Sequence, residues 1–524
     1  MRCYYSIVAS FYVQNFGCRA TQADGAAIER QFEERGLDRA SELGEAEIVV
    51  LNTCTVTSSA DQDARAAIRR VHRENPQARI VVTGCYAQRS PEELAALPGV
   101  SQVIGNSHKH QLAEIATVNL IQSPAAVCDP VSAFISVGKL KAAWDSSQRP
   151  TTDGQGLGSD QRLSFSRRPT TDDRRRVWVS DIFAHTELLA APVFDAANER
   201  TRPNLKVQDG CDNRCSFCVI PYVRGQSRSL KLDQILQEVN ALVAAGYREL
   251  VISGINLGRW GRDLEGGVKS QVSAAHRDER PLSNLGFSQR PTTNDQRLVH
   301  LIRAVLDHTS LEKLRISSVE PMDWSDDLIA LVAGSPRIAK HVHVPMQSGS
   351  DTVLRRMHRK YRPWHYREKI EKIRAAMPTA AIGADVMVGF PGETEVEFAE
   401  TPRMIEDLPL TYLHVFTYSA RPGTPAAEMT NQVAVRVARE RNRILRELSE
   451  KKKLSFMRSF VGETVEAITL SGGADAPVGG TSPVFTEALT DNYLKLRLNG
   501  QHESNHWVRA QVERCEDGAL VAVT

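Results

Sequence analysis

The sequence predicts an α/β protein with an open parallel α/β sheet domain at its N-terminus, a partial or full (β/α) barrel in its middle and a small β-barrel at its C-terminus. In residues 11–120 and again in 203–430, short apolar runs alternate with stretches of helical periodicity, a rhythm that favours parallel sheets covered by helices. Residues 459–524 instead hold short β runs between turns rich in Gly, Asn and Asp. A length of 524 residues, 41% of them hydrophobic, suits about three domains with buried cores.

Charge, cysteine content and hydropathy exclude several classes of protein. The formal net charge is +2, so any nucleic-acid site is expected to be a local patch rather than a whole-molecule field. Nine thinly spread cysteines, an odd number, do not suit the disulfide framework of a small secreted protein. No apolar run reaches the roughly 18 to 20 residues that span a bilayer, and the N-terminal stretch lacks a clear signal-peptide cleavage site. We therefore expect a cytoplasmic protein without membrane contact.

The N-terminal domain, predicted over residues 1–125, contains three strands that each lead into a cysteine. The expected strands are 11–15, 48–51 and 80–83, and the expected helices between them are 21–35 and 60–73. Cys18, Cys54 and Cys85 follow the three strands directly. Because ligands bind at the carboxyl edge of open parallel sheets, we expect the three thiols to be delivered to one rim. Buried, inert thiols at strand ends are the competing interpretation.

The middle of the chain reads as a barrel with a basic helix after it. Leu232, Ile235, Val239 and Leu242 follow helical spacing, and strands are expected at 249–253, 313–317, 341–345, 381–388 and 411–417. The predicted domains are a low-complexity linker at 138–180, the barrel at 197–430 with a polar insertion at 266–296, a basic helix at 431–458 and the C-terminal β domain at 459–524.

Both polar segments carry a short repeat. The sequence SQRPTTD at 147–153 returns as SRRPTTD at 166–172 and as SQRPTTN at 288–294. The spacing is irregular, which excludes a solenoid. The composition favours disordered surface insertions, with a functional basic arm as the alternative.

The strongest chemical signal is the spacing of Cys211, Cys215 and Cys218. Thiolates at such spacing bind zinc or an iron–sulfur cluster. Structural zinc requires a fourth ligand, and no nearby Cys or His supplies one. Three thiolates on a cubane [4Fe-4S] cluster leave one iron open, which can take the amino and carboxylate groups of S-adenosylmethionine (SAM) and pass an electron to its sulfonium. Structural zinc and inert core cysteines remain alternatives.

At this point a family resemblance becomes visible. Residues 206–221, KVQDGCDNRCSFCVIP, resemble the core motif of the radical SAM methylthiotransferases, and the following RGQSRS at 224–229 also fits. RISSVEP at 315–321, HVPMQSGS at 343–350 and DVMVGFPGE at 385–393 are similar to the barrel motifs of that family, and the C-terminal segment looks like a TRAM domain. One departure is Thr21, which stands where the family often has Asn. The resemblance implies a radical SAM core in the predicted barrel.

The resemblance also implies cofactors and partners. In the family, cysteines placed like Cys18, Cys54 and Cys85 hold a second [4Fe-4S] cluster, where sulfur is held and methylated before transfer. Two [4Fe-4S] clusters, SAM and an electron donor of the flavodoxin or ferredoxin type are therefore expected, while the sulfur source stays open. Polar groups at barrel strand ends are the predicted SAM contacts. They are Ser253, Gly254, Asn256, Ser317, Glu320, Gln347 and Asp385.

Two local patches favour an RNA partner. Residues 355–374 carry nine Lys or Arg against two Glu, interleaved with aromatic residues, and residues 436–458 carry nine against three. Phosphates favour such patches, and aromatic rings stack on splayed bases, although a solvated helix face explains each patch equally well. Residues 459–524 are acidic, with four Lys or Arg against nine Asp or Glu. The predicted RNA contacts are Arg224, Arg228, Arg359, Lys360, Arg443, Lys451, Lys495 and Arg497.

Among the branches of the family, KVQDG at 206–210 and NTCTVT at 52–57 look most like the one that acts on threonylcarbamoyladenosine. The resemblance therefore implies transfer of a methylthio group to C2 of N6-threonylcarbamoyladenosine 37 in tRNA. Isopentenyladenosine of tRNA is an alternative substrate, and the acidic C-terminal segment favours the third branch, which modifies a ribosomal-protein aspartate. A zinc-stapled RNA-binding protein without catalysis is the alternative from a different class.

Overall fold

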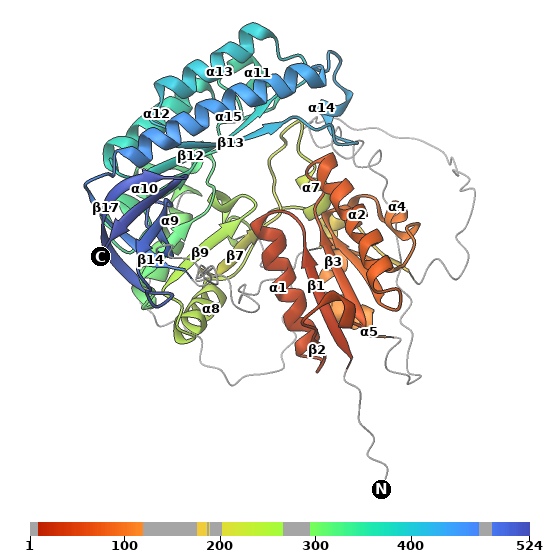
Figure 1. The fold of residues 1–524 in the computed structure, drawn as a ribbon. Coiled ribbons are helices and arrows are strands. Elements are labelled where there is room, and N and C mark those ends of the chain that lie inside the picture. The colour runs from red at the N-terminus through yellow and green to blue at the C-terminus, as the bar shows by residue number, and fades with distance from the viewer. Residues whose placement is uncertain (1–8, 119–175, 186–187, 189–201, 266–293, 471–484) are drawn as a thin grey trace, which may run out of the picture. The chain divides into compact units, whose positions relative to one another are not determined.

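The computed structural model describes residues 9–118, 176–185, 188, 202–265, 294–470 and 485–524 (Figure 1). The repeat-bearing segments at 147–153 and 166–172 lie outside these residues, as do residues 288–293 of the third copy. The chain divides into two compact units. Unit 1 comprises Met1–Leu189, Phe217–Gly225 and Ser419–Glu428, and unit 2 comprises Ala190–Ser216, Gln226–Tyr418 and Met429–Thr524. The sequence placed the whole of 197–430 in the barrel domain, whereas two short segments of that range group with unit 1. The predicted domain bounds stay a prediction.

Unit 1 is built on the parallel sheet that the sequence predicted. Its strand order is β2-β1-β3-β4-β5-β6, and every pairing is parallel (Figure 1). The strands are β1 (Ser10–Asn15), β2 (Asp38–Arg39), β3 (Ile48–Thr53), β4 (Arg79–Gly84), β5 (Val100–Gly105) and β6 (Val177–Trp178). The helices are α1 (Arg19–Glu33), α2 (Ser58–Glu74), α3 (Cys85–Arg89), α4 (Pro91–Ala95), α5 (Leu112–Thr117) and α7 (Ile220–Arg224), with α14 (Pro425–Glu428) from the later segment.

Burial on both faces explains why the strands of unit 1 are continuously apolar. All six residues of β3 are buried, as is expected of a parallel strand covered by helices on each side. Val49 and Leu51 pack in one hydrophobic cluster, and Ile48 and Val50 pack in a second one. The side chain of Thr57 accepts a hydrogen bond from the Ala60 backbone N–H and so caps α2. These elements hold the carboxyl edge of the sheet, where the cysteines lie, on a rigid base.

Unit 2 contains a partial (β/α) barrel made of two sheets. One has the order β10-β9-β7-β8 and the other β11-β12-β13, with only β8 antiparallel to its neighbour. The Val319 backbone N–H donates to the His343 carbonyl and links the two sheets. The strands are β7 (Asn204–Asp209), β8 (Arg228–Ser229), β9 (Glu249–Gly254), β10 (Lys313–Ile316), β11 (His341–His343), β12 (Ala381–Val388) and β13 (Tyr412–Thr417).

Helices alternate with the barrel strands, as the sequence predicted. They are α8 (Leu232–Ala244), α9 (Asn294–His308), α10 (Asp326–Gly334), α11 (Asp351–Arg356), α12 (Pro363–Ala376), α13 (Glu395–Asp407) and α15 (Val435–Arg458). Among the described residues of unit 2, the long basic helix α15 packs against β13 and leads into the C-terminal β domain.

The C-terminal domain is a closed barrel with the order β14-β15-β16-β18-β17, which confirms the predicted small β-barrel. Its strands are β14 (Thr464–Thr469), β15 (Phe485–Thr490), β16 (Lys495–Asn499), β17 (Trp507–Glu516) and β18 (Ala519–Val523). Met457 and Phe460, at the end of α15 and just after it, lie in the hydrophobic core of this barrel. Helix and barrel therefore share one core.

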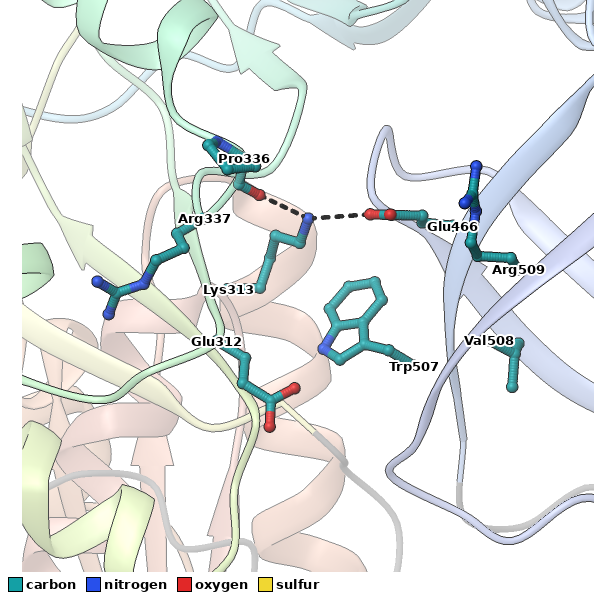
Figure 2. Close-up of a pocket in the computed structure, with 8 residues that line it drawn as sticks. All are labelled: Glu312, Lys313, Pro336, Arg337, Glu466, Trp507, Val508 and Arg509. Carbon is teal, nitrogen blue, oxygen red and sulfur yellow. Dashed lines mark hydrogen bonds and ion pairs between the residues drawn. The ribbon is translucent and has the colours of Figure 1, made fainter.

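Polar contacts also dock the small barrel on the partial barrel within unit 2. Lys313 Nζ donates to the Pro336 carbonyl at 2.8 Å and lies 3.5 Å from Glu466 (Figure 2). The same ammonium lies 4.9 Å from the centre of the Trp507 ring, a cation–π distance (Figure 2). The face of the Trp507 ring is thus engaged by the protein itself. Within the described residues, we find no helix that is both long and apolar enough to cross a bilayer.

Candidate active site

The three N-terminal cysteines lie at the carboxyl edge of the unit 1 sheet, as predicted. Cys18 precedes α1, Cys54 directly follows β3, and Cys85 is the first residue of α3 after β4. Cys54 and Cys85 are buried, whereas Cys18 is exposed. Burial, together with the nearby thiols of Cys85 and Cys18, raises the pKa of the Cys54 thiol to about 12. The three sulfurs are therefore close enough to influence one another.

The backbone around the three cysteines suits a multi-iron cluster. Gly17 has φ +110°, and a Cβ added there would lie 2.7 Å from Cys54 Cβ, so that only glycine lets the two loops approach. Cys18, Cys54 and Cys85 do not form a group whose sulfurs all lie within 4.8 Å of one another, which argues against a single ion between them. Three thiols spread around a rim suit a larger cluster with three ligands.

Polar side chains surround the same rim. The Thr21 hydroxyl lies 3.6 Å from Cys18 Sγ, and Asn106 Nδ2 donates to Cys85 Sγ at 3.7 Å. Thr21, the position that departs from the family, therefore keeps a polar atom beside the first cysteine. Hydrogen bonds to sulfur are among the features that set the potential of an iron–sulfur cluster.

A buried charge cluster lies behind the rim. Asp24 Oδ2 accepts from Lys109 Nζ at 2.9 Å and from Arg224 Nη2 at 3.0 Å, and all three side chains are at most 5% exposed. Two cations beside one carboxylate would favour thiolates and an anionic cluster at the nearby cysteines. No local signal marked Asp24 or Lys109 in the sequence.

Helix α7 follows the second cysteine motif in the chain and packs beside Cys85 of the first motif. It begins at Ile220, two residues after Cys218, and lies within unit 1. Val219 and Val223 form a hydrophobic cluster with Cys85. The Asn106 side chain donates to the Val223 carbonyl at 2.7 Å. The segment that leaves the radical SAM motif is thus packed directly on a cysteine of the other motif.

The segment Ser419–Glu428 is tied to the same unit by Arg421. Its Nη1 donates to the Thr55 carbonyl at 3.1 Å, one residue after Cys54, and lies 2.9 Å from Asp61 Oδ2. Asp61 also accepts from Arg89 at 2.8 Å. Arg421 therefore fixes the loop that carries Cys54, a role that sequence reasoning missed.

In unit 2, Cys211 and Cys215 lie beyond the end of β7 among donors to sulfur. Cys211 Sγ accepts from the Asn213 backbone N–H at 3.4 Å and from Asn256 Nδ2 at 3.6 Å. Arg359 Nη1 donates to Cys215 Sγ at 3.2 Å. Cys218 is half-buried and belongs to unit 1. Because thiolates accept such bonds, this donor set fits cluster ligands.

Arg359 is itself held by two partners. It donates to the Glu320 carboxylate and, through Nε, to the Tyr361 hydroxyl at 3.3 Å. The Tyr361 hydroxyl donates onward to the backbone carbonyls of Pro345 and Met346. The guanidinium of Arg359 is thus buried among Cys215, Glu320 and Tyr361, and its predicted RNA contact stays a prediction. Glu320, a predicted SAM residue, contacts this arginine.

Several of the predicted SAM residues present polar atoms that lack a partner. Ser253 Oγ, Ser317 Oγ and Asn256 Oδ1 are buried without a hydrogen bond among the described residues. Buried polar atoms are normally satisfied, so orphaned ones at strand ends suit an absent polar ligand. Gly254 is required by close packing, because a Cβ there would lie 2.8 Å from Gln208 Oε1.

Gln347 and Asp385, the other two predicted SAM residues, lie beside each other. The Gln347 backbone N–H donates to the Asp385 carbonyl at 2.8 Å, and Gln347 has φ 63°. The Asp385 carboxylate lies between the imidazoles of His343 and His414. Burial alone would raise the pKa of Asp385, but the two imidazoles outweigh it and hold this pKa well below its usual range.

The predicted RNA contacts divide by exposure. Arg224 and Arg228 are buried, the first on Asp24 and the second 3.8 Å from Asp209, and their predicted RNA contacts stay predictions. The remaining side chains reach solvent. They are Lys360, Arg443, Lys451, Lys495 and Arg497.

Two of these line a cavity of about 480 Å³ between β13, α15 and the small barrel. Lys495 and Arg497 meet Lys453 from α15 there, together with the rings of Tyr412 and Tyr493. Basic groups beside aromatic rings are the combination that binds single-stranded nucleic acid. Arg497 also lies 3.6 Å from Asp517, and Arg443 is paired with Glu440 and Glu447 on the surface of α15.

Comparison with known proteins finds one family match for the N-terminal sheet domain and another for the partial barrel. Residues 10–105 match an uncharacterized protein family, UPF0004, and residues 205–405 match the radical SAM superfamily. The threonylcarbamoyladenosine tRNA methylthiotransferase MtaB of Bacillus subtilis is 32% identical over 95% of this chain and 92% of its own length, and that of Aquifex aeolicus is 31% identical over 95% and 99%. A tRNA-2-methylthio-N(6)-dimethylallyladenosine synthase of Thermobifida fusca is 31% identical over 88% of this chain and 78% of its own length.

Proposed function

Since this chain belongs to the radical SAM methylthiotransferase family, we propose that it transfers a methylthio group to C2 of N6-threonylcarbamoyladenosine 37 in tRNA. The observation that carries the reaction class is the packing of α7, which follows Cys218, onto Cys85. The substrate rests on relatives with this named activity that align with 95% of the chain.

Two cysteine sets provide for the two halves of the chemistry. When bound, the cluster on Cys211, Cys215 and Cys218 supplies the electron that cleaves SAM, and the cluster on Cys18, Cys54 and Cys85 holds the sulfur to be transferred. The donors on Cys211 and Cys215, from Asn256 and Arg359, stabilise thiolate ligands in a site that also offers the unpaired hydroxyls of Ser253 and Ser317.

We infer that tRNA meets the enzyme at the cavity lined by Lys453, Lys495 and Arg497. The small barrel carries an acidic balance as a whole, so a local basic edge is needed for RNA. A tRNA substrate implies a cytoplasmic reaction, and a flavodoxin or ferredoxin is the expected electron donor.

The alternative substrate is dimethylallyladenosine of tRNA, favoured by the relative that is 31% identical. Both substrates present an adenosine whose C2 receives the group, so the described geometry serves either one. The ribosomal-protein aspartate of the third branch finds no support among the relatives named above.

Mass spectrometry of tRNA nucleosides tests the proposal. A host without methylthiotransferase activity of its own is compared with and without this chain. New 2-methylthio-N6-threonylcarbamoyladenosine is the expected result. New 2-methylthio-dimethylallyladenosine would move the assignment to the alternative substrate, and no methylthio nucleoside from iron-loaded protein would overturn both.

A further inference from the structure

Three neighbouring strands of the partial barrel bring two histidines and an aspartate together. His343 ends β11, Asp385 lies in β12, and His414 lies in β13. His343 pairs with Gly383, and Asp385 pairs with His414. Because side chains two residues apart on a strand share a face, the three side chains emerge on one face of this sheet.

Gly383 leaves room for the ring of Tyr412, which lies beside the two histidines. A Cβ at this position would lie 2.1 Å from the Tyr412 ring. The ring of Tyr412 therefore crosses β12 at Gly383, with its centre 6.2 Å from that of His343 and 5.3 Å from that of His414. Its hydroxyl lies 2.6 Å from His341 Nε2, which fixes the ring in place.

The distances within the group suit a bound metal ion. Asp385 Oδ1 lies 3.3 Å from His343 Nε2 and 3.3 Å from His414 Nδ1, and the three ligand atoms lie within 4.8 Å of one another. Tetrahedral zinc with bonds of about 2.0 to 2.1 Å separates its ligand atoms by roughly 3.3 Å. Both measured separations therefore equal the edge of such a coordination sphere.

The direction of the His343 ring gives a second, independent observation. Its Nε2 atom is buried and makes no hydrogen bond among the described residues, although Asp385 Oδ1 is only 3.3 Å away. A buried imidazole nitrogen that faces the carboxylate at this distance, outside good hydrogen-bond geometry, suits a metal ligand. Exposure rises from 9% at the His343 side chain to 55% at that of His414, so one side of the group is open.

We propose that His343, Asp385 and His414 bind one divalent transition-metal ion, with open coordination positions on the side of His414. Two imidazoles and one carboxylate form a ligand set that zinc and ferrous iron favour. The site's three ligands belong to neither cysteine set, and the bound ion would add a Lewis-acid centre that can take an oxygen ligand. It also gives Asp385 a different role from the SAM contact that the sequence predicted.

Zinc titration of the holoenzyme tests the site. The enzyme is first loaded with both clusters, so that the six cysteines are occupied, and Zn²⁺ alone is then added in a calorimeter while the iron content is followed. One equivalent of zinc should bind without loss of iron. X-ray absorption at the zinc edge should show nitrogen and oxygen ligands, including imidazole, and no sulfur.

Variants identify the ligands. His414→Ala alters a half-exposed side chain and should weaken zinc binding by more than the roughly 10- to 100-fold that loss of an outer-shell partner costs. His343→Gln should do the same, with circular dichroism as the check on folding. His506→Ala, at a half-exposed histidine of the small barrel, is the matched control and should bind zinc like the parent.

Three outcomes would overturn the proposal. They are no zinc uptake by the iron-loaded enzyme, zinc uptake only as iron is lost, and unchanged affinity in His414→Ala. Sulfur ligands at the zinc edge would equally count against it. All of these readouts are independent of methylthio transfer, so the site and the proposed function fail separately.

Discussion

At the scale of single residues, a variant of Cys54 distinguishes methylthio transfer from SAM cleavage. Cys54 is buried at the rim that also carries Cys85 and Cys18, and it belongs to unit 1, whereas the SAM-motif cysteines Cys211 and Cys215 belong to unit 2. We predict that Cys54→Ala abolishes methylthio transfer but leaves reductive SAM cleavage, and lowers the iron content from about eight to about four per chain. Nucleoside mass spectrometry, 5′-deoxyadenosine release and iron analysis measure the three effects.

Cys515 is the matched control for this variant. It lies half-buried in the small barrel, and Cys515→Ala should keep both activities and the full iron content. Full methylthio transfer by Cys54→Ala would contradict the assignment of the second cluster.

Asp24 offers a second residue-scale prediction. Its carboxylate is the shared partner of Lys109 and Arg224, both buried. Asp24→Asn removes the buried carboxylate that both cations contact and should destabilise unit 1 by about 3 to 5 kcal/mol. Native-state hydrogen exchange of the β3 amides measures this loss. Glu114→Gln, which breaks an exposed pair with Arg35, should change it by less than about 1 kcal/mol.

Lys495 tests the RNA surface. It is exposed at the edge of the cavity that Lys453 and Arg497 also line. Lys495→Ala should weaken tRNA binding and reduce the slope of log affinity against log salt by about 1, the value for one lost phosphate contact. Arg514→Ala, on an exposed side chain of the same small barrel paired with Glu516, should change neither quantity. An unchanged salt slope in Lys495→Ala would place the RNA elsewhere.

At the scale of elements, helix α13 carries a built-in acid sensitivity. Thr394 and Glu397 form a capping box at its start, and Arg356 lies 2.8 Å from both carboxylate oxygens of Glu397. The hydrogen bonds from Arg356 are the main cause that lowers the pKa of Glu397 to about 2. A depressed carboxyl pKa contributes stability above the unfolded value of about 4.3, and this contribution is lost as the pH falls from there towards 2.

Hydrogen exchange of the first-turn amides of α13 measures this effect. Their opening free energy should fall between pH 5 and pH 3 in the parent. Glu397→Gln should be less stable at pH 7 and nearly flat over that range, whereas Glu400→Gln, on an exposed residue of the same helix, should follow the parent. A pH-independent parent would remove Glu397 as the titrating group.

The bounds of the strands and helices show how much of the fold the sequence could predict. Local periodicity located β12 at its observed bounds, and β10 and β13 within one residue, because strand and helix patterns depend on near neighbours. It could not assign α7 or Arg421 to unit 1, since their partners Asp24 and Asp61 lie about 200 and 360 residues away. Counts of basic residues likewise could not reveal that Arg359 is buried on Cys215, because burial is decided by tertiary packing.

At the scale of the whole molecule, Arg315 couples the partial barrel to the C-terminal barrel within unit 2. This fully buried side chain bonds Glu249 through Nε at 2.6 Å and reaches across to the carbonyls of Asp491 and Thr490 at 2.9 and 3.4 Å. The guanidinium carbon also lies 5.4 Å from the centre of the Tyr493 ring. One planar cation thus serves both domains, and Tyr493 lines the cavity proposed for RNA.

Arg315→Lys should therefore loosen the small barrel without removing the charge beside Glu249. A lysine has no fork with which to reach two carbonyls, and hydrogen bonds to charged groups are worth about 1.5 to 3 kcal/mol each. We predict faster proteolysis between α15 and β14, weaker tRNA binding and unchanged SAM cleavage, because the cysteines do not depend on the docked barrel. Arg514→Lys, an exposed arginine on the same barrel, should behave like the parent. If Arg315→Lys bound tRNA as the parent does while the barrel became protease-sensitive, docking would be a matter of stability alone, and the RNA would have to be held by the partial barrel.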